Sequence, residues 1–407
     1  MRISVLKFGG TSVADPEKIQ RAADRAIAER KKGRGVVVVV SAPGEMTDEL
    51  LTLAHRVAPE PAARELDQLL STGEQVGISL FAMACHSRGA PATSLTGPQA
   101  GIEGGGHHTR AHIVRIRPAK ILRELRAGRI VTVAGFQALN PVDDVATLGR
   151  GGSDLTAVAL ASALKTGACE IFTDVKGVYT ADPRVVYEAR KLSRITFEEM
   201  LELAGAGAQV MQARSLEVAE RFGVRIHVRS AFHPQNGTWI VPKEDPMMEK
   251  AYVSALALDK NEVRLSVVDV PDRPGVAAQV LSVLAARDIP LDMIIQSAPT
   301  HAGLNDISLM VPRAFAHKAR EALAPIARKL KARVDLHDQV AKVSAVGTGF
   351  RHHPRVAATM FETLAKHKIN IHMIVASDLR VSCVVDSKHG ETALRSLHRA
   401  YGLSRKK

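Results

Sequence analysis

Two glycine-rich segments carry the residues best suited to handling anions. In "KFGGTS" the glycines let backbone amides approach an anion closely, and Lys7 supplies a compact positive charge. In "TLGRGGSDLTAVALA" three glycines surround Arg150, whose guanidinium fork matches a carboxylate. Ser153 and Asp154 can cap the apolar helix that follows, and the positive end of a helix favours anions. Together they predict a site for an acidic small molecule beside a phosphate. The alternatives are an ordinary strand-to-helix turn with a surface lysine at Lys7, and simple capping of the second helix by Ser153 or Asp154.

A third segment, "FTDVKGVYTADPR", leaves a strand at Thr173 and Asp174 and continues as a loop. In a parallel α/β sheet such a loop lies at the carboxyl ends of strands, where ligands bind. Tyr179 can border a base or ribose, Asp182 can accept from a ribose hydroxyl or help to hold a metal, and Arg184 can reach phosphate. The alternative is a structural hairpin that uses "ADP" as a turn.

Two further segments place single polar residues near the expected site. Thr47 follows the second strand in "TDELL", and Glu74 in "STGEQ" is expected in a first helical turn. There Glu74 can bind an ammonium group, or it is simply an acid favoured by the helix dipole. No GxxxxGK[ST] or GxGxxG segment occurs at the first turn, which argues against a P-loop or a Rossmann dinucleotide site.

A glycine-rich stretch, "GGGHHTRAH", contains His107, His108 and His112 without a paired acid or cysteine. This pattern favours a surface hairpin over a metal site, and we expect no side chain of this chain to form a metal site by itself.

The elements that must position these residues alternate between β-branched runs and helical patterns over roughly the first 245 residues. A helix is predicted to start at an Asp15 cap with Pro16 in its first position. The run "GVVVVVSA" is apolar on both faces, as a buried parallel strand requires. The predicted strands are 3–8, 35–42, 130–136, 169–175 and 224–229. The pattern indicates an α/β fold with a largely parallel sheet between helices.

An internal repeat follows. Residues 272–295, "DRPGVAAQVLSVLAARDIPLDMII", align without gaps with residues 352–375, "HHPRVAATMFETLAKHKINIHMIV", and a strand is predicted before each. Two such copies can pair their sheets and bind a ligand between them, or the duplication serves stability alone.

The composition narrows the functional classes. The chain has 407 residues, a net charge of +13, three widely spaced cysteines and 4% aromatic residues. Without paired cysteines or a long apolar run, we expect neither disulfides nor a membrane span, and a cytoplasmic location. A nucleic-acid partner would rest on charge alone, and the basic residues are dispersed.

Together the segments resemble the aspartokinase family over essentially the whole chain. The matching stretches are "KFGGTSV", "VVVVSA", "TDELL", "STGEQ", "TLGRGGSDLTAVALA", "TDVKGVYTADPR" and "TFEEMLELA". The resemblance implies an amino-acid-kinase fold over residues 1–245. It also implies two ferredoxin-like βαββαβ ACT domains, at 262–340 and 341–407, the second completed by a strand from 251–259. It implies ATP and Mg²⁺ as cofactors and phosphorylation of the L-aspartate β-carboxylate, the first step toward lysine, methionine and threonine.

The resemblance also implies roles for individual residues. Lys7, Arg150 and Asp182 would be catalytic. The implied nucleotide-binding residues are Lys7, Phe8, Gly9, Gly10, Ser41, Thr173, Asp174, Tyr179, Asp182, Arg184 and Gln209. The implied aspartate-binding residues are Thr47, Glu74, Arg150, Gly151, Gly152 and Ser153. Lysine or threonine, or both, would bind at the ACT domains through Asp272, Gly275, Val276, Asp292, Met293, Ile294, Gln296, His353, Val356, Asn370, Ile371 and Ser377.

The family organisation suggests a homo-oligomer formed through the ACT domains and a shorter ACT-only chain starting near Met247. The sequence departs from the family at Gln209, where a lysine is usual, and at Arg355, where glycine is usual. Loss of the lysine would weaken ATP binding, and Arg355 would obstruct an effector loop. Two alternatives to an aspartate kinase therefore stay open: a kinase for glutamate or another small acid, and an amino-acid sensor of the same fold with weakened catalysis.

Overall fold

The computed structural model describes residues 1–208, 210–243, 252–299, 303–350 and 353–404. Contacts divide the chain into two compact units. The first comprises Met1–Val178, Lys191–Leu201 and the described part of Gln209–Pro246, and the second comprises Tyr179–Arg190, Glu202–Ala208 and the described part of Met247–Lys407. Two short segments from the predicted catalytic region thus belong to the second unit.

The first unit is built on a sheet with the strand order β10-β12-β11-β9-β1-β2-β6-β3 among the described residues. Its strands are β1 (Ile3–Phe8), β2 (Gly35–Val40), β3 (Ala92–Leu95), β6 (Ile130–Ala134), β9 (Ala168–Thr173), β10 (Arg194–Thr196), β11 (Arg225–Ser230) and β12 (Thr238–Val241). All neighbours pair in parallel except β11 and β12. This confirms the largely parallel α/β fold.

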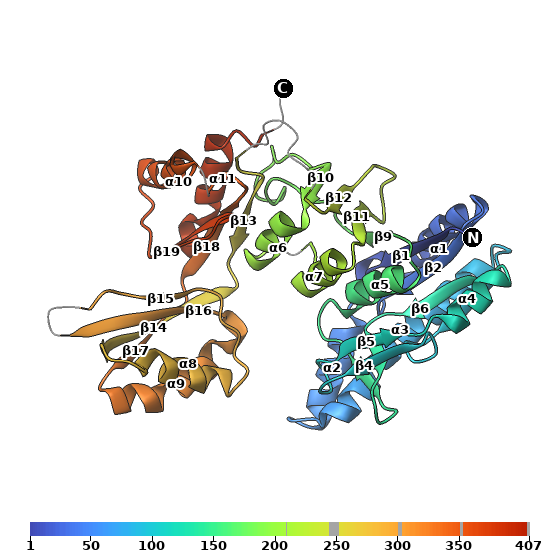
Figure 1. The fold of residues 1–407 in the computed structure, drawn as a ribbon, viewed down its shortest axis with the longest axis horizontal. Coiled ribbons are helices and arrows are strands. Elements are labelled where there is room, and N and C mark those ends of the chain that lie inside the picture. The colour runs from blue at the N-terminus through green and yellow to red at the C-terminus, as the bar shows by residue number, and fades with distance from the viewer. Residues whose placement is uncertain (209, 244–251, 300–302, 351–352, 405–407) are drawn as a thin grey trace. The chain divides into compact units, whose positions relative to one another are not determined.

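Helices cover both faces of this sheet (Figure 1). They are α1 (Pro16–Lys31), α3 (Ala63–His86), α4 (Ala119–Arg126), α5 (Gly152–Ala163) and α7 (Ala213–Arg221). Helix α2 (Met46–Val57) packs on α3, and α6 (Phe197–Gly205) follows β10. Alternation along β1 sends Phe8 into the apolar core beneath α1 and α3, and Lys7 to the opposite face, toward α5. The Asp15 carboxylate accepts a hydrogen bond from the Lys18 amide at 2.8 Å, which confirms the predicted cap of α1.

A small second sheet of the first unit has the order β5-β4-β7-β8. It is formed by β4 (Ile102–Gly105), β5 (His112–Ile116), β7 (Gln137–Leu139) and β8 (Val145–Thr147). Strands β4 and β5 form the hairpin that the histidine-rich stretch predicts.

The second unit contains both copies of the repeat. The first copy is β14 (Glu262–Pro271), α8 (Val276–Ala285), β15 (Ile294–Gln296), β16 (Leu304–Pro312), α9 (Ala316–Leu330) and β17 (Arg333–His337). The second copy is β18 (Val340–Val346), α10 (Pro354–Lys366), β19 (Met373–Ala376), β20 (Arg380–Asp386) and α11 (Gly390–Ala400). No strand follows α11 in the described chain, and β13 (Ala255–Asp259) pairs with β18 in the place that β17 takes beside β14.

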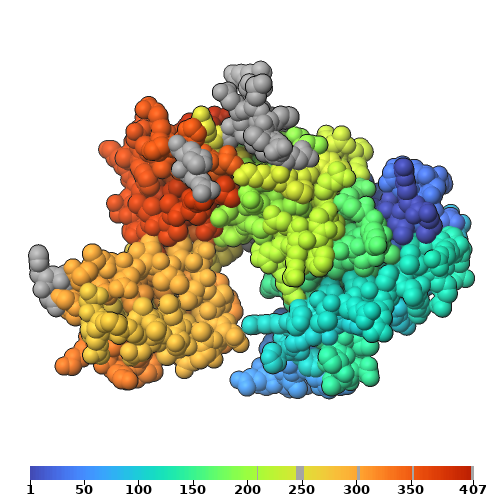
Figure 2. All heavy atoms as spheres, in the orientation of Figure 1, coloured from blue at the N-terminus to red at the C-terminus, as the bar shows by residue number. Residues whose placement is uncertain are grey.

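The two copies lie side by side within the second unit (Figures 1 and 2). Met293 and Met373, which are equivalent in the repeat, meet in one buried cluster with Met310, Val340 and Val384. This shared core explains why the pair behaves as one compact body rather than two linked domains.

Candidate active site

The carboxyl ends of β1 and β2 bring two glycine-containing loops into backbone contact. The Ser41 amide donates to the Phe8 carbonyl at 3.2 Å, and the Gly44 amide donates to the Gly10 carbonyl at 3.1 Å. A Cβ on Gly10 would lie 2.8 Å from the Ala42 carbonyl oxygen, so a larger residue would force the loops apart. Gly9 lies next to the ammonium group of Lys7, since a Cβ on Gly9 would be 3.4 Å from Lys7 Nζ.

Lys7 is buried at the end of β1 and forms an ion pair with the first turn of α5. Its Nζ lies 2.6 Å from Asp154 Oδ1, and both side chains are about a tenth exposed. The pairing holds the ammonium at the glycine loop, where a phosphate would meet it. Phe8 next to it stacks on Phe172 with ring centroids 4.8 Å apart, which joins the ends of β1 and β9.

The prediction that Ser153 and Asp154 cap the helix was wrong. Helix α5 begins at Gly152, and its cap is Gly151 in the left-handed conformation (φ 72°), without a side-chain hydrogen bond. Asp154 pairs with Lys7 instead. Ser153 packs closely on Gly135, because a Cβ on Gly135 would lie 2.5 Å from the Ser153 hydroxyl oxygen. Arg150 is exposed just before this helix start. The helix therefore presents its positive end with no side chain of its own bonded to it.

The sequence predicted Glu74 in a first helical turn, and this prediction was wrong. Glu74 lies in the middle of α3, and Gly73 and Gly77 on the same helix pack so closely on the loop after β2 that neither position has room for a Cβ. Glu74 Oε1 accepts from the Ala42 amide at 3.1 Å, whereas Oε2 is buried and has no hydrogen-bond partner among the described residues. Burial raises the pKa of this carboxyl to about 7, against the opposing effects of the backbone amides of Ala42 and Glu74 and of the Gln137 side chain. A carboxylate oxygen buried in this way is suited to receive an ammonium group.

The remaining predicted residues fall in different places. Thr47 is half-buried at the start of α2, and the Thr173 hydroxyl donates to Asp174 at 2.9 Å after β9. Tyr179, Asp182 and Arg184 belong to the second unit. There Tyr179 packs on the core of the second copy, and Asp182 accepts hydrogen bonds from the Arg184 amide and guanidinium, which lower the pKa of Asp182. Gln209 and Met247 lie outside the described residues.

Comparison with known proteins decides the family. Residues 2–230 match the amino acid kinase family, and residues 265–325 and 343–401 match the ACT domain. The aspartate kinase Ask_LysC of Stutzerimonas stutzeri is 45% identical over 99% of this chain and 98% of its own. The aspartokinase of Thermus thermophilus is 44% identical over the full length of both chains. The chain belongs to the aspartokinase family.

The structural comparison agrees. The crystal structure of E. coli aspartokinase III in complex with aspartate and ADP superposes with a TM-score of 0.82 at 26% identity, covering 98% of this chain and 99% of that one. This confirms the predicted resemblance and shows that an aspartokinase fold extends over both units. No helix in the described part of the chain has the length and apolar character needed to cross a membrane.

In this aspartokinase-family chain, four of the predicted effector residues line one cavity of about 380 Å³ in the first copy of the repeat. They are Asp272, Gly275, Val276 and Gln296. The cavity is also lined by Asn305, which the sequence did not single out. Asn305 is buried, donates to Asp272 Oδ1 at 3.0 Å, and leaves its own Oδ1 without a partner in the described structure.

The other predicted effector residues are not part of this cavity. Asp292 pairs with the buried Lys342, Met293 lies in the core between the copies, and Ile294 is 49% exposed. In the second copy His353 contacts the Tyr252 ring, Val356 is buried in the core, Asn370 is exposed, Ile371 packs beside the core, and Ser377 donates to Glu202.

The two copies differ where Gly275 and Arg355 are equivalent. Gly275 is the left-handed cap of α8 (φ 91°), whereas Arg355 lies inside α10, which begins one residue earlier at Pro354. Both copies have a proline at the preceding position, so the difference comes from the next residue: an arginine disfavours the positive φ that glycine adopts, and it joins the helix instead.

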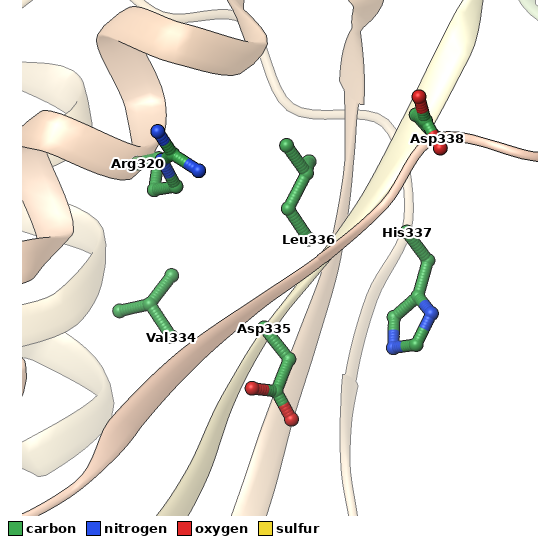
Figure 3. A pocket seen from close by; sticks show the side chains of 6 residues that line it. All are labelled: Arg320, Val334, Asp335, Leu336, His337 and Asp338. Atoms are coloured by element: carbon green, nitrogen blue, oxygen red, sulfur yellow. The ribbon is translucent and has the colours of Figure 1, made fainter.

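A second cavity, of about 440 Å³, is lined by Arg320 of α9 and by Val334–Asp338 along and beyond β17 (Figure 3). Val334 and Leu336 pack against the core beneath α9, and strand alternation places Asp335 and His337 on the other face. None of the predicted effector residues lines it.

Proposed function

We propose that this chain transfers the γ-phosphoryl group of ATP to the β-carboxylate of L-aspartate and forms 4-phospho-L-aspartate. The observation that carries the proposal is the buried Glu74 Oε2, which has no hydrogen-bond partner among the described residues. The other oxygen of the same carboxyl, Oε1, accepts from the loop after β2. The ammonium group of aspartate would fill this position, and Arg150 at the start of α5 would take the α-carboxylate. Thr47 and Ser153, with the backbone at Gly151 and Gly152, would complete the aspartate site.

The nucleotide would bind at the glycine loop. Lys7, Gly9 and Gly10 would hold its phosphates beside Phe8 and Ser41, with Thr173 and Asp174 at the end of β9. Tyr179, Asp182, Arg184 and Gln209 are proposed as further nucleotide contacts. The related E. coli aspartokinase III crystallised in complex with aspartate and ADP, which supports this pair of ligands.

The chemistry needs positioning more than proton transfer. The β-carboxylate is ionised at neutral pH and attacks the γ-phosphorus without a general base, while the bond from that phosphorus to the ADP oxygen breaks. The difficulty is to bring two anions together. Lys7 offsets the phosphate charge and the open N-terminus of α5 offsets the carboxylate, so that the two groups can approach.

Mg²⁺ fits this site only together with the nucleotide. The described residues contain no group of three histidine, cysteine or acidic side chains that would hold a metal alone. Mg²⁺ in kinases is commonly held by one or two carboxylates and the substrate phosphates, so Asp174 at the end of β9 is the candidate carboxylate beside the glycine loop. The ion would neutralise charge on the β- and γ-phosphate oxygens.

We also propose that lysine or threonine, or both, regulate the enzyme from the 380 Å³ cavity. A free amino acid needs one acceptor for its ammonium group and donors for its carboxylate. The unpartnered Asn305 Oδ1 and the Asp272 carboxylate supply acceptors, and the loop of Gly275 supplies backbone amides at the start of α8. E. coli aspartokinase III also crystallised in complex with lysine and aspartate, which supports an effector of this class.

The assignment of domains and assembly belongs to the same proposal. We place the catalytic domain at 1–245 and the ACT domains at 262–340 and 341–407, with β13 completing the second. The edge strands β15 and β19 expose Ile294 (49%) and Ile374 (46%) at equivalent positions. Such apolar edges support a homo-oligomer through the ACT domains, which light scattering at several protein concentrations would reveal.

The deciding experiment traps the acyl phosphate with hydroxylamine and measures ATP-dependent aspartyl hydroxamate. Glutamate replaces aspartate in a parallel assay, and lysine and threonine are added singly and together. Turnover with aspartate that is lost in Lys7→Ala supports the kinase. Folded protein that binds lysine or threonine without any turnover contradicts it and supports the amino-acid sensor instead.

A further inference from the structure

A buried carboxylate that the sequence did not single out lies beside the proposed aspartate site. Asp67 of α3 is fully buried. Its Oδ1 accepts from the Thr147 hydroxyl at 2.5 Å, and its two oxygens accept from the Thr109 amide at 3.1 and 2.9 Å. Its Oδ2 lies 2.9 Å from His108 Nδ1, which must donate because a carboxylate only accepts. These three partners come from segments 41 to 80 residues away in the chain.

What Asp67 holds is the backbone that leads to Arg150. Thr147 ends β8, and its carbonyl accepts from the Ala111 amide at 2.9 Å. The next carbonyl, of Leu148, accepts from the Arg214 guanidinium at 2.8 Å. Two residues later the chain reaches Arg150. The approach to this arginine is therefore bound by side chains and backbone from three separate segments.

The loop that Asp67 organises is strained and fits closely against the same segment. Thr109 has a left-handed backbone (φ 66°), which non-glycine residues rarely adopt. A Cβ on Gly149 would lie 3.3 Å from the Thr109 carbonyl oxygen, so loop and segment are in contact. The two hydrogen bonds from the Thr109 amide to Asp67 compensate for part of this strain.

Asp67 and Glu74 lie on one face of the same helix. They are seven residues apart, which is two helical turns and about 10 Å along the axis. Glu74 contacts the loop after β2 and directs its unpartnered oxygen into the proposed ammonium position. One helix thus carries the residue that would bind the ammonium group and, through Asp67, contacts the segment that leads to the residue for the α-carboxylate.

We propose that Asp67 is a positioning residue that, through Thr147, fixes the distance between Arg150 and Glu74 and thereby sets the fit to aspartate. The inference rests on the proposed function, because it takes Arg150 and Glu74 as aspartate contacts. In aspartate the ammonium and α-carboxylate share one carbon, so their binding groups must keep a fixed separation. Loss of the Asp67–Thr147 hydrogen bond lets the Arg150 segment shift, which weakens the binding of aspartate more than the binding of ATP.

The test compares steady-state kinetics of Thr147→Val, Thr147→Ser and Asp67→Asn with the unmodified protein. Thr147→Val keeps the side-chain shape and removes only the hydroxyl. We expect the KM for aspartate to rise about tenfold, as for the loss of one hydrogen bond to a charged group, with the KM for ATP changed less than twofold. Thr147→Ser should restore the KM. When Thr147→Val is already present, Asp67→Asn should raise the KM for aspartate by a smaller factor than it does in the unmodified protein.

A matched control is available in the same unit. The Thr196 hydroxyl donates to the buried Glu199 carboxylate at 3.0 Å, away from the segment that leads to Arg150. Thr196→Val should leave the KM for aspartate unchanged. Equal rises of both KM values in Thr147→Val, or the same effect in Thr196→Val, would show a merely structural role and overturn the proposal.

Failure of the proposed function would look different. Glu74→Gln and Arg150→Ala are measured beside these variants. If they raise the KM for aspartate and Thr147→Val does not, only the positioning role of Asp67 is wrong. If neither of them affects aspartate, the assignment of the site itself is wrong. Should Asp67→Asn fail to fold, the comparison of Thr147→Val with Thr147→Ser still decides.

Discussion

Lys7 Nζ lies 2.6 Å from Asp154 Oδ1, and this ion pair joins the end of the first strand to the first turn of the helix that follows Arg150. The two glycine-rich segments of the sequence thereby lie side by side. The pair also explains why an acidic residue at this helix start does not act as its cap, since its carboxylate is already engaged.

Replacement of Lys7 by methionine should lower kcat by about 100- to 1000-fold, as expected for the loss of a charge-stabilising group. Asp154→Asn keeps the Lys7 ammonium group and should lower kcat less than Lys7→Met does. The hydroxamate assay measures both, with circular dichroism to confirm the fold. Lys7→Met activity within tenfold of the unmodified protein would contradict a role in phosphoryl transfer.

The activity should depend on the ionisation of Glu74. Burial raises the pKa of this carboxyl to about 7, and only the ionised form attracts an ammonium group. We expect kcat/KM for aspartate to rise with pH up to about 7 and then level off. Glu74→Gln should have low kcat/KM and lack this step. A step that persists in Glu74→Gln would assign it to another group.

The same carboxyl should affect stability in the opposite direction. Its folded pKa is above its unfolded value, so its contribution is fully present below about pH 4.5 and is lost as the pH rises through about 7. Without ligands, Glu74→Gln should gain stability over the unmodified protein between pH 5 and 8. Urea unfolding at several pH values measures this, and a constant difference across the range would exclude Glu74 as its source.

His227 should make the first unit sensitive to acid. Its ring stacks on Trp239 at 4.1 Å, and burial lowers its pKa to about 4. Below about pH 6.5 His227 binds a proton in the unfolded chain but stays neutral in the folded chain, so the free energy of unfolding falls from pH 6.5 toward 4. His227→Phe keeps a stacked ring and should lose less stability over this interval. His317→Phe, at a position with a side chain 76% exposed, is the control and should behave like the unmodified protein.

Asp272→Ala should abolish binding of the amino-acid effector. The 380 Å³ cavity has few charged groups, and this carboxylate also orients Asn305. Calorimetric titration with lysine and with threonine measures the loss. Asp335→Ala, in the cavity of Figure 3, should leave binding unchanged. The reverse pattern would move the effector site to β17.

Lys342→Met should destabilise the second unit by about 3–5 kcal/mol, because it leaves the buried Glu262 and the partly buried Asp292 without their cation. Lys342 is 1% exposed, lies 3.1 Å from Glu262 Oε2 and pairs with Asp292. Burial already raises the pKa of Glu262. Adding Glu262→Gln should recover part of the loss in urea unfolding. Equal loss in Lys388→Met, an exposed lysine, would contradict this explanation.

Much of the fold could be predicted because its signals are local. The Asp15 cap with Pro16, the continuous valines of β2 and the repeated segments are written in neighbouring residues, and the structure confirms each. The predicted second strand was too long at residues 41–42, since the chain leaves the sheet after Val40 and the Gly44 amide binds the Gly10 carbonyl. The turn is imposed by a partner far along the chain.

The sequence by itself indicated which residues are chemically suited to anions and determined that two repeated units follow an α/β domain, because residue type and periodicity are properties of neighbouring residues. Only the tertiary structure decided that Asp154 pairs with Lys7, that Glu74 is buried in mid-helix and that Asp67 holds Thr147 across 80 residues. The physical reason is that burial and hydrogen-bond partners depend on which distant segments the topology brings together, and neighbouring residues carry no record of that.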